Sequence, residues 1–185
     1  GGKAPVLNHA ITERATGELV YCLDGDSTLA PDAITKSAAY FADEQVVATA
    51  SNVNILPERT VLGFVQRFEY LVNHHMKKAQ TAFNLEYIIG GIGSMFRRET
   101  LAEVGYYDTN TMTEDIDLTL KIIAVNGNRS SRVVFAADAL VYTEAVPSFR
   151  SLVKQRTRWK YGRAQTFYKN RRLFFSRERK HTVLL

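Results

Sequence analysis

Hydrophobic and polar residues follow two patterns along the chain, helical spacing in some stretches and short continuous apolar runs in others. The helical spacing predicts helices over residues 3–14, 60–82 and 113–125, and start signals at Pro31 and Pro147-Ser148 predict two more over residues 31–42 and 148–168. Apolar runs with β-branched and aromatic members predict strands over residues 18–23, 46–50, 94–97, 133–136 and 139–143. Alternating strands and helices favour an α/β sandwich with a mixed, mostly parallel sheet.

The two central helices carry apolar residues that we expect to face the core. In the helix over 60–82 these residues are Leu62, Val65, Phe68, Leu71 and Val72. In the helix over 113–125 they are Ile116, Leu120, Ile123 and Ala124. Pro31 stands where a helix favours proline, so we expect the helix over 31–42 to begin there.

Positive charge is concentrated at the end of the chain. Residues 148–185 hold 12 of the 24 Lys and Arg residues but only one of the 19 Asp and Glu residues. Phe174 and Phe175 lie among these cations, a mixture that suits an anionic membrane surface or a nucleic acid. A solvated helix end is the simpler interpretation.

The sequence contains no apolar run of about 18 residues, so we expect no membrane-spanning helix within it. Its single cysteine, Cys22, excludes an intramolecular disulfide, and the cytosol is the default compartment. The first segment has no preceding strand and the apolar last residues have no continuation, so we expect a piece of a longer protein.

Two carboxylates flank a glycine where the first predicted strand ends, in the order Asp24-Gly25-Asp26-Ser27. In open α/β sheets, ligands bind outside the carboxyl ends of strands. Gly25 permits a sharp bend, so Asp24 and Asp26 could face one Mg²⁺ or Mn²⁺ that in turn holds a phosphate or diphosphate. Ordinary turn and N-cap chemistry would also account for this tetrapeptide.

A second acidic group, Thr113-Glu114-Asp115-Ile116-Asp117, opens a predicted helix. Thr113 can act as its N-cap, and acids in the first turn complement the helix dipole. Asp115, ionised near the positive end of the helix, could also serve as a general base toward an incoming hydroxyl. Both interpretations can hold together.

The last predicted helix carries Gln155, Arg158 and Trp159 at helical spacing, on one face. The indole offers a flat apolar surface to a sugar, and arginine can bind a phosphate through two hydrogen bonds. The alternative is a buried Trp159 with arginines that extend to solvent.

Three of these motifs, in this order, resemble the signature of processive family 2 glycosyltransferases, which make cellulose, chitin, hyaluronan and poly-N-acetylglucosamine. They are Asp24-x-Asp26, Thr113-Glu114-Asp115 and Gln155-x-x-Arg158-Trp159. The opening Gly2-Lys3-Ala4-x-x-Leu7-Asn8 and the central Gly91-x-Gly93-Ser94-x-x-Arg97-Arg98 are also similar to segments of this family. The resemblance covers nearly the whole chain.

The resemblance implies a GT-A type fold and an inverting transfer from a nucleotide sugar. Asp24 and Lys3 would contact the nucleotide, and Asp26, with Asp24, would hold the Mg²⁺ or Mn²⁺ on the diphosphate. Asp115 would deprotonate the acceptor hydroxyl. The acceptor and polymer site would include Gln155, Arg158, Trp159, Gly93, Ser94 and Glu114, with Arg158 also reaching the diphosphate.

The resemblance also divides the chain. Residues 1–147 would hold the C-terminal part of the catalytic core, and residues 148–185 its last helix and a basic juxtamembrane tail. Family members have a nucleotide-binding βα unit before the Gly-Lys-Ala segment, and it is absent here, so we expect an exposed sheet edge that could pair with another copy. Membrane helices that follow the last helix would place the domain at the cytoplasmic face of the cell membrane.

Within the family, the segments GGIGSMFRRE and KQRTRWKYG most resemble bacterial poly-N-acetylglucosamine synthases, which favours UDP-N-acetylglucosamine as donor. Hyaluronan, chitin-oligosaccharide and cellulose-type synthases remain as alternatives. Two other classes stay open: a basic module that binds nucleic acid or membrane, and a catalytically silent subunit. The enzyme interpretation expects no nucleic-acid partner.

Overall fold

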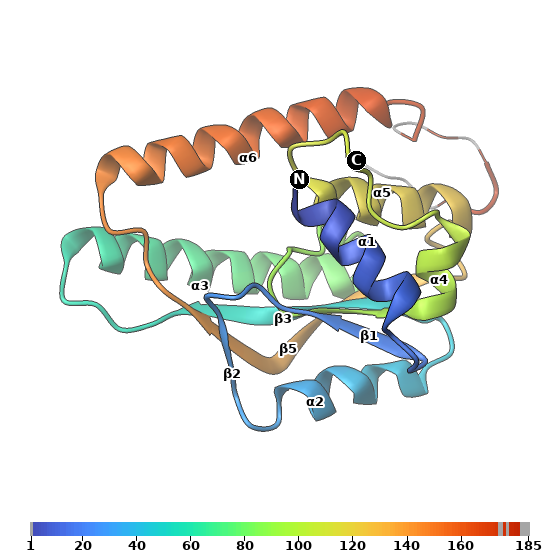
Figure 1. Cartoon of the computed structure of the whole chain (residues 1–185), viewed down its shortest axis with the longest axis horizontal. Helices are drawn as coiled ribbons and strands as arrows, with labels where there is room; N and C mark the ends of the chain where they lie inside the picture. Colours follow the sequence, from blue (N-terminus) through green and yellow to red (C-terminus); the bar gives the residue numbers. More distant parts are fainter. Residues whose placement is uncertain (1, 174–175, 177, 182–185) are drawn as a thin grey trace.

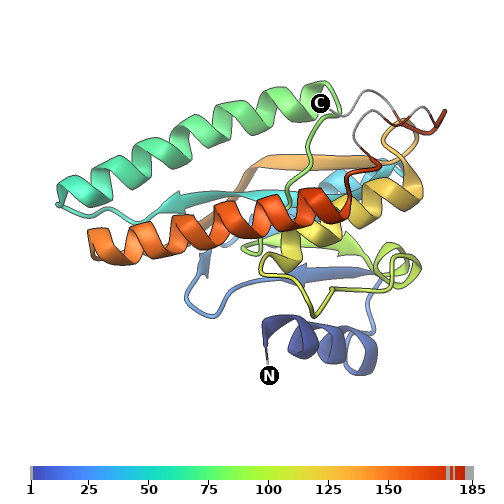
Figure 2. The ribbon, with the colours of Figure 1, turned by 90° about the horizontal axis from the view of Figure 1, so that it is seen from above.

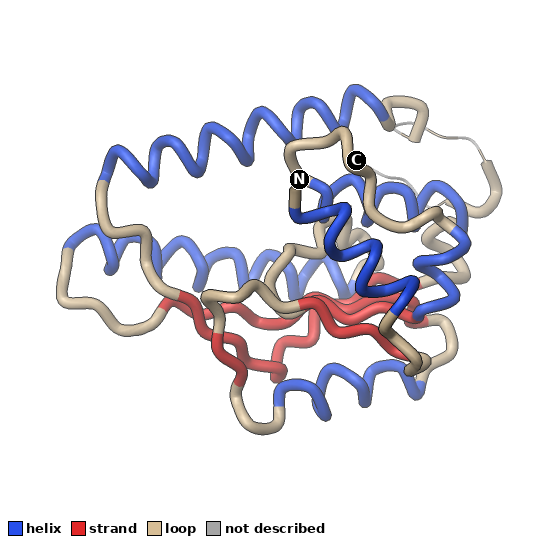
Figure 3. Tube along the Cα trace, in the orientation of Figure 1, coloured by secondary structure: helices blue, strands red, loops and turns tan. Residues whose placement is uncertain are grey.

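The computed structural model describes residues 2–173, 176 and 178–181. A five-stranded sheet is covered by α2 on one face and by the other helices on the opposite face, with α6 farthest from the sheet (Figures 1 and 3). In the view from above, α6 lies between α3 and α1 (Figure 2). The strands lie in the order β1-β4-β3-β5-β2. They are β1 (Leu19–Cys22), β2 (Thr28–Leu29), β3 (Val46–Ile55), β4 (Ser94–Arg97) and β5 (Arg132–Thr143).

The sheet is mixed, as expected, but it is not mostly parallel. Of the four pairs of neighbouring strands, only β3–β5 is parallel, and the other three are antiparallel. The two predicted strands over 133–136 and 139–143 form the single strand β5. Its register against β3 shifts between the pairs Ser51–Ala136 and Asn52–Leu140, so residues 137–139 bulge out of an otherwise continuous ladder.

The five predicted helices are all present, with ends that differ from the predicted ones by at most three residues. They are α1 (Lys3–Glu13), α2 (Ala33–Ala39) with a 3₁₀ turn (Tyr40–Ala42), α3 (Val61–Ala82), α5 (Glu114–Asn126) and α6 (Phe149–Lys169). The sequence patterns missed α4 (Arg98–Glu103) and the two-residue β2, because neither is long enough to show a period. Helix α2 begins at Ala33, two residues after Pro31.

The main core lies between the sheet and helices α1, α4 and α5. Ile116, Leu120 and Ile123 of α5 are buried, as predicted, and Ala124 is half-buried. The residues of α5 that belong to this core are Leu118 and Ile122, which the predicted face left out. Strand β3 is buried without interruption from Val46 to Asn52, although Thr49, Ser51 and Asn52 are polar. Packing on both faces of the sheet therefore fixes the strand ends from which the site is built.

The prediction for the apolar side of α3 is wrong. Val65, Phe68, Leu71 and Val72 are 51%, 59%, 54% and 41% exposed, whereas Gly63 and Gln66 are buried. The physical reason is that the face of α3 toward the sheet supplies hydrogen bonds to backbone. The Gln66 amide bonds both the N–H and the C=O of Val146, and Thr81 Oγ1 accepts from the N–H of Phe135 on β5.

Strand β1 forms one edge of the sheet and pairs only with β4 within the described residues. Pairing of this edge with another strand stays a prediction. None of the helices in the described part of the chain is both long enough and apolar enough to cross a membrane. Phe174 and Phe175, which the sequence placed in the basic tail, lie outside the described residues.

Candidate active site

Four charged side chains from three distant segments meet around the backbone of Gly91. Lys3 begins α1 and is paired with Asp24, which follows β1, and its Nζ lies 3.7 Å from Glu114 Oε1 at the start of α5. A Cβ atom placed on Gly91 would lie 2.8 Å from Lys3 Nζ and 3.7 Å from Asp115 Oδ2. We call Lys3, Asp24, Glu114 and Asp115 the Gly91 cluster.

Helix α1 is fixed so that its first residue reaches this cluster. Ala4 and Ile11 are buried against the core, and the Asn8 amide makes two hydrogen bonds to the backbone of Tyr107, at 2.8 and 2.9 Å. The Asn8 clamp therefore explains structurally why an asparagine follows the Gly-Lys-Ala segment.

Asp115 is held by two backbone N–H groups. Its Oδ2 accepts from Gly91 at 3.0 Å and its Oδ1 accepts from Ile116 at 2.9 Å. Burial raises the pKa of Asp115; Glu114 raises it further, whereas the Ile116 N–H and the charge of Lys3 lower it. A fixed carboxyl group with a raised pKa is a stronger base than an ordinary aspartate, which suits proton abstraction.

Lys3 remains firmly charged within the cluster. Burial disfavours its charge, but the neighbouring carboxylates, Asp24 first and then Glu114 and Asp115, more than offset this effect and raise the pKa of Lys3. The cluster thus presents a cation between the carboxylate that follows β1 and the two that begin α5. Such a cation can bind an anionic group such as a phosphate.

Asp26 lies apart from the cluster, in the turn after β1. Its side chain is exposed, and its carboxylate accepts a hydrogen bond from Ser27 Oγ at 3.3 Å. The described residues contain no group of three or more His, Cys, Asp or Glu side chains placed to hold a metal ion. Exposed carboxylate oxygens such as those of Asp26 are the ligand type that suits a hard cation whose remaining ligands are water and substrate oxygens.

Helix α6 presents two of its three predicted residues to one hollow. Gln155 and Arg158 line an open hollow of about 630 Å³ together with Met112 and Tyr161. Trp159 does not line it: the Arg156 guanidinium stacks on the indole, 4.1 Å from the ring centre. Arg156 also pairs with Glu69 of α3 at 2.7 Å, so it joins the two helices rather than facing solvent.

Gly93 and Ser94 lie inside the sheet. Gly93 is buried, and Ser94 is 1% exposed and pairs in the ladder with Cys22, two residues before Asp24. Both residues are therefore covered by their neighbours in this structure.

A clasp between α5 and α6, which the sequence patterns did not reveal, fixes the position of α6. A Cβ atom on Gly162 would lie 2.4 Å from Thr113 Cγ2, so only glycine allows the two helices to approach this closely. Thr113 Oγ1 lies 3.3 Å from Thr166 Oγ1 instead of capping its own helix, and Lys169 Nζ is 2.9 Å from each oxygen of the buried Asp117.

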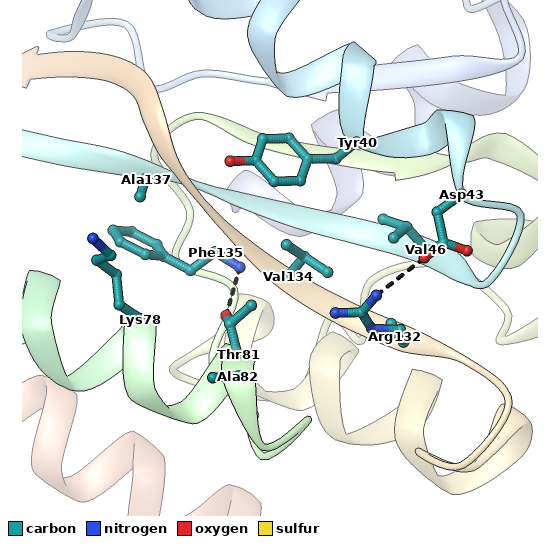
Figure 4. Close-up of a pocket in the computed structure, with 10 residues that line it drawn as sticks. All are labelled: Tyr40, Asp43, Val46, Lys78, Thr81, Ala82, Arg132, Val134, Phe135 and Ala137. Carbon is teal, nitrogen blue, oxygen red and sulfur yellow. Dashed lines mark hydrogen bonds and ion pairs between the residues drawn. The ribbon is translucent and has the colours of Figure 1, made fainter.

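A second hollow, of about 400 Å³, lies at the first residues of β3 and β5 (Figure 4). An ion pair between Arg132 and Asp43, at 3.0 Å, borders it, and Lys78 and Phe135 line its other side. Strands β1, β3 and β5 share one direction, so this hollow lies toward the end of the sheet opposite Asp24. None of the predicted site residues lines it.

Comparisons with known proteins agree with the motifs. A family model described as "Glycosyltransferase like family 2" matches residues 1–162. The poly-beta-1,6-N-acetyl-D-glucosamine synthases of Staphylococcus aureus (strain COL) and Staphylococcus epidermidis (strain ATCC 35984) are 31% and 30% identical to this chain over 163 residues. Each match covers 87% of this chain and 38% of the relative, so the chain spans well under half of their length.

Solved structures with the same arrangement include a mannosyltransferase from Pyrobaculum calidifontis in complex with GDP-Man and Mn²⁺. It is 27% identical, with a TM-score of 0.68 over 92% of this chain and 44% of that chain. The S. aureus TarS structure in complex with UDP-GlcNAc is 17% identical, with a TM-score of 0.54 over 80% of this chain and 40% of that chain, and supports the fold alone.

Proposed function

Because the chain belongs to glycosyltransferase family 2 and forms part of a GT-A type fold, we propose that it acts in the transfer of N-acetylglucosamine from UDP-N-acetylglucosamine to a growing β-linked polysaccharide. The observation that carries this proposal is the Gly91 cluster, where a fixed carboxylate suited to act as a base lies beside a lysine suited to a phosphate. The choice of sugar follows the names of the staphylococcal relatives.

The proposed reaction is a single displacement with inversion. Asp115 takes the proton of the acceptor hydroxyl as its oxygen forms a bond to the anomeric carbon of the donor. The bond from that carbon to the diphosphate oxygen breaks, and UDP leaves with the bonding electron pair. An α-linked donor thereby becomes a β-linked product without a covalent enzyme intermediate.

The residues around Asp115 divide between the two substrates in this proposal. Lys3 and Asp24 bind the nucleotide side, and Glu114 adjoins the acceptor side. Asp26, with Asp24, would hold the Mg²⁺ or Mn²⁺, which when bound stabilises negative charge on the leaving diphosphate. The Mn²⁺ and GDP-Man in the mannosyltransferase structure support a metal-assisted nucleotide-sugar site.

The acceptor end would extend along α6. Gln155 and Arg158 offer an amide and a guanidinium to the hollow, which suits hydroxyl-rich and anionic ligands. Trp159 would contribute only the indole face that Arg156 leaves uncovered. The α5–α6 clasp keeps this surface in a fixed position relative to Asp115.

The site of action that we propose is the cytoplasmic face of the cell membrane. Helix α6 carries seven Lys and Arg residues and no acidic residue, a charge distribution that favours an anionic lipid surface.

Donor choice tests the proposal directly. The full-length protein in membranes, supplied with Mn²⁺ or Mg²⁺, should release UDP and form polymer from UDP-N-acetylglucosamine but not from UDP-glucose or UDP-glucuronate. Turnover of one of the other donors alone would replace the sugar and keep the mechanism. Absence of turnover with all three donors by folded protein would contradict the enzymatic proposal and favour a silent subunit.

Two substitutions should move the pH dependence of transfer in opposite directions. Activity falls as Asp115 is protonated, so the acid limb of the kcat/KM profile reports its pKa in the free enzyme. Lys3→Met removes a cation that lowers the pKa of Asp115, so the acid limb should move to higher pH. Glu114→Gln removes an anion that raises this pKa, so the limb should move to lower pH. Shifts in the same direction would contradict the assignment of the base.

A further inference from the structure

The loop between α3 and β4, residues 84–93, carries the N–H group that binds Asp115, and we call it the Gly91 loop. Gly93 O accepts from Ser51 N at 2.9 Å, which joins the end of the loop to the sheet. Gly90 and Gly91 have no side chains with which to pack, so the position of Gly91 depends on how the residues on either side are anchored.

Lys77 and Glu86 anchor the first half of the loop. Lys77 Nζ, on the face of α3 that lies toward the sheet, donates to Ile88 O at 2.6 Å and to Glu86 Oε1 at 3.1 Å. The same Glu86 oxygen accepts from Ile88 N at 3.1 Å. One ion pair therefore binds both backbone groups of Ile88, three residues before Gly91.

The next residue connects the loop to the helix that carries the base. Ile89 N donates to Thr119 Oγ1 at 3.0 Å, and this hydroxyl donates in turn to the backbone oxygen of Asp115 at 2.9 Å. Ile89 is fully buried. The loop is thus tied at Glu86, Ile88 and Ile89 before it reaches Asp115.

Burial of the Glu86 carboxylate is unfavourable, and packing alone does not explain why an acidic residue occupies this position. Glu86 is 3% exposed, and its second oxygen, Oε2, is buried and has no hydrogen-bond partner among the residues that the structure describes. An apolar residue would fill this place without an unpaired acceptor. What the carboxylate adds is a fixed path for the loop.

We propose that Lys77 and Glu86 are positioning residues that hold the Gly91 loop so that the Gly91 N–H stays on Asp115 Oδ2. This proposal rests on the assignment of Asp115 as the base of the proposed function. With the loop held, Oδ2 keeps its N–H donor and the orientation of the carboxylate toward an acceptor is set. Without the anchor, the carboxylate loses a donor that favours its charged form, so its pKa rises.

The test compares Lys77→Met with Lys78→Met in the full-length protein. Lys78 is the matched control because it neighbours Lys77 on α3 but is exposed and lines the distant hollow of Figure 4. Hydrogen exchange of peptides covering residues 86–93, measured without substrate, should be at least about fivefold faster in Lys77→Met and unchanged in Lys78→Met.

Transfer kinetics give the second measurement. In Lys77→Met the acid limb should move up by roughly 0.5–1 pH unit, the amount expected for one lost hydrogen bond, and kcat should fall while KM for the donor is kept. Lys77→Met leaves the Glu86 charge buried without its cation, so this variant could fail to fold. The double variant Lys77→Met/Glu86→Gln removes both charges, and the same two measurements on it then test the proposal.

The outcomes separate the two proposals. If folded Lys77→Met shows the same hydrogen exchange and the same acid limb of the pH profile as Lys78→Met, the positioning role is overturned and the proposed function is left intact. Wild-type protein that transfers no sugar would contradict the proposed function, whereas the exchange measurement, which needs no turnover, would still decide whether Lys77 and Glu86 hold the loop.

Discussion

Asp115→Asn should abolish sugar transfer while donor binding is largely kept. An amide cannot accept the hydroxyl proton, and loss of a general base typically lowers kcat by about 10²–10⁴-fold. The substitution nearly preserves shape: the amide oxygen can replace Asp115 Oδ2 as acceptor for the Gly91 N–H, and the Ile116 N–H then loses its acceptor. The donor Kd should therefore stay within about threefold of the wild-type value, because the proposed nucleotide contacts are made by other residues.

UDP release and polymer formation measure the loss, and calorimetry with UDP-N-acetylglucosamine measures donor binding. Asp138→Asn is the control, because this exposed aspartate bonds Tyr40 on the α2 side of the sheet and has no place in the site. Polymer synthesis at the wild-type rate in Asp115→Asn would move the base to another residue.

The sequence predicted those parts of the site in which the residue type and its place at the end of a strand or helix together suggest a chemical role. Asp24 follows a strand and Glu114 and Asp115 begin a helix, so their positions follow from where elements end. Their meeting around Gly91, with Lys3 between them, needed the fold, because more than 80 residues separate Asp24 from Glu114.

Features that the patterns did not predict depend on polar groups that serve a distant segment. The side of α3 that carries Gln66, Lys77 and Thr81 looks solvent-facing in sequence, yet it binds backbone of β5 and of two loops. Periodicity reports where apolar residues lie, but it cannot report which N–H and C=O groups need partners. Because the polar side of α3 faces the sheet to supply these partners, its apolar side is left exposed.

The same limit applies to α6. Its spacing placed Gln155, Arg158 and Trp159 on one face, but the position of Arg156 over the indole depends on Glu69, which lies 87 residues earlier. The helix itself was predictable from Pro147-Ser148, and the Ser148 side chain caps it by accepting from Ser151 N. The contacts that its side chains make with α3 were not predictable from the sequence.

Asp26→Ala should remove the dependence of donor binding on Mn²⁺. The Asp26 carboxylate is exposed, accepts a hydrogen bond from Ser27 and contributes nothing to the Gly91 cluster, so its loss should leave folding unchanged. Without it, a cation would keep only Asp24, one of whose oxygens already binds Lys3. We expect kcat/KM to fall on the order of 10²-fold or more, because a metal supplies several kcal/mol of charge stabilisation to a leaving diphosphate.

Calorimetric measurement of donor binding at increasing Mn²⁺ concentration distinguishes the loss of a metal ligand from a loss of fold. Asp32→Ala is the matched control, since Asp32 is an exposed aspartate six residues later whose partner is Lys36. The control should respond to Mn²⁺ as the wild type does, whereas Asp26→Ala should bind the donor equally weakly with and without the cation. A wild-type response in Asp26→Ala would show that groups other than Asp26 hold the cation.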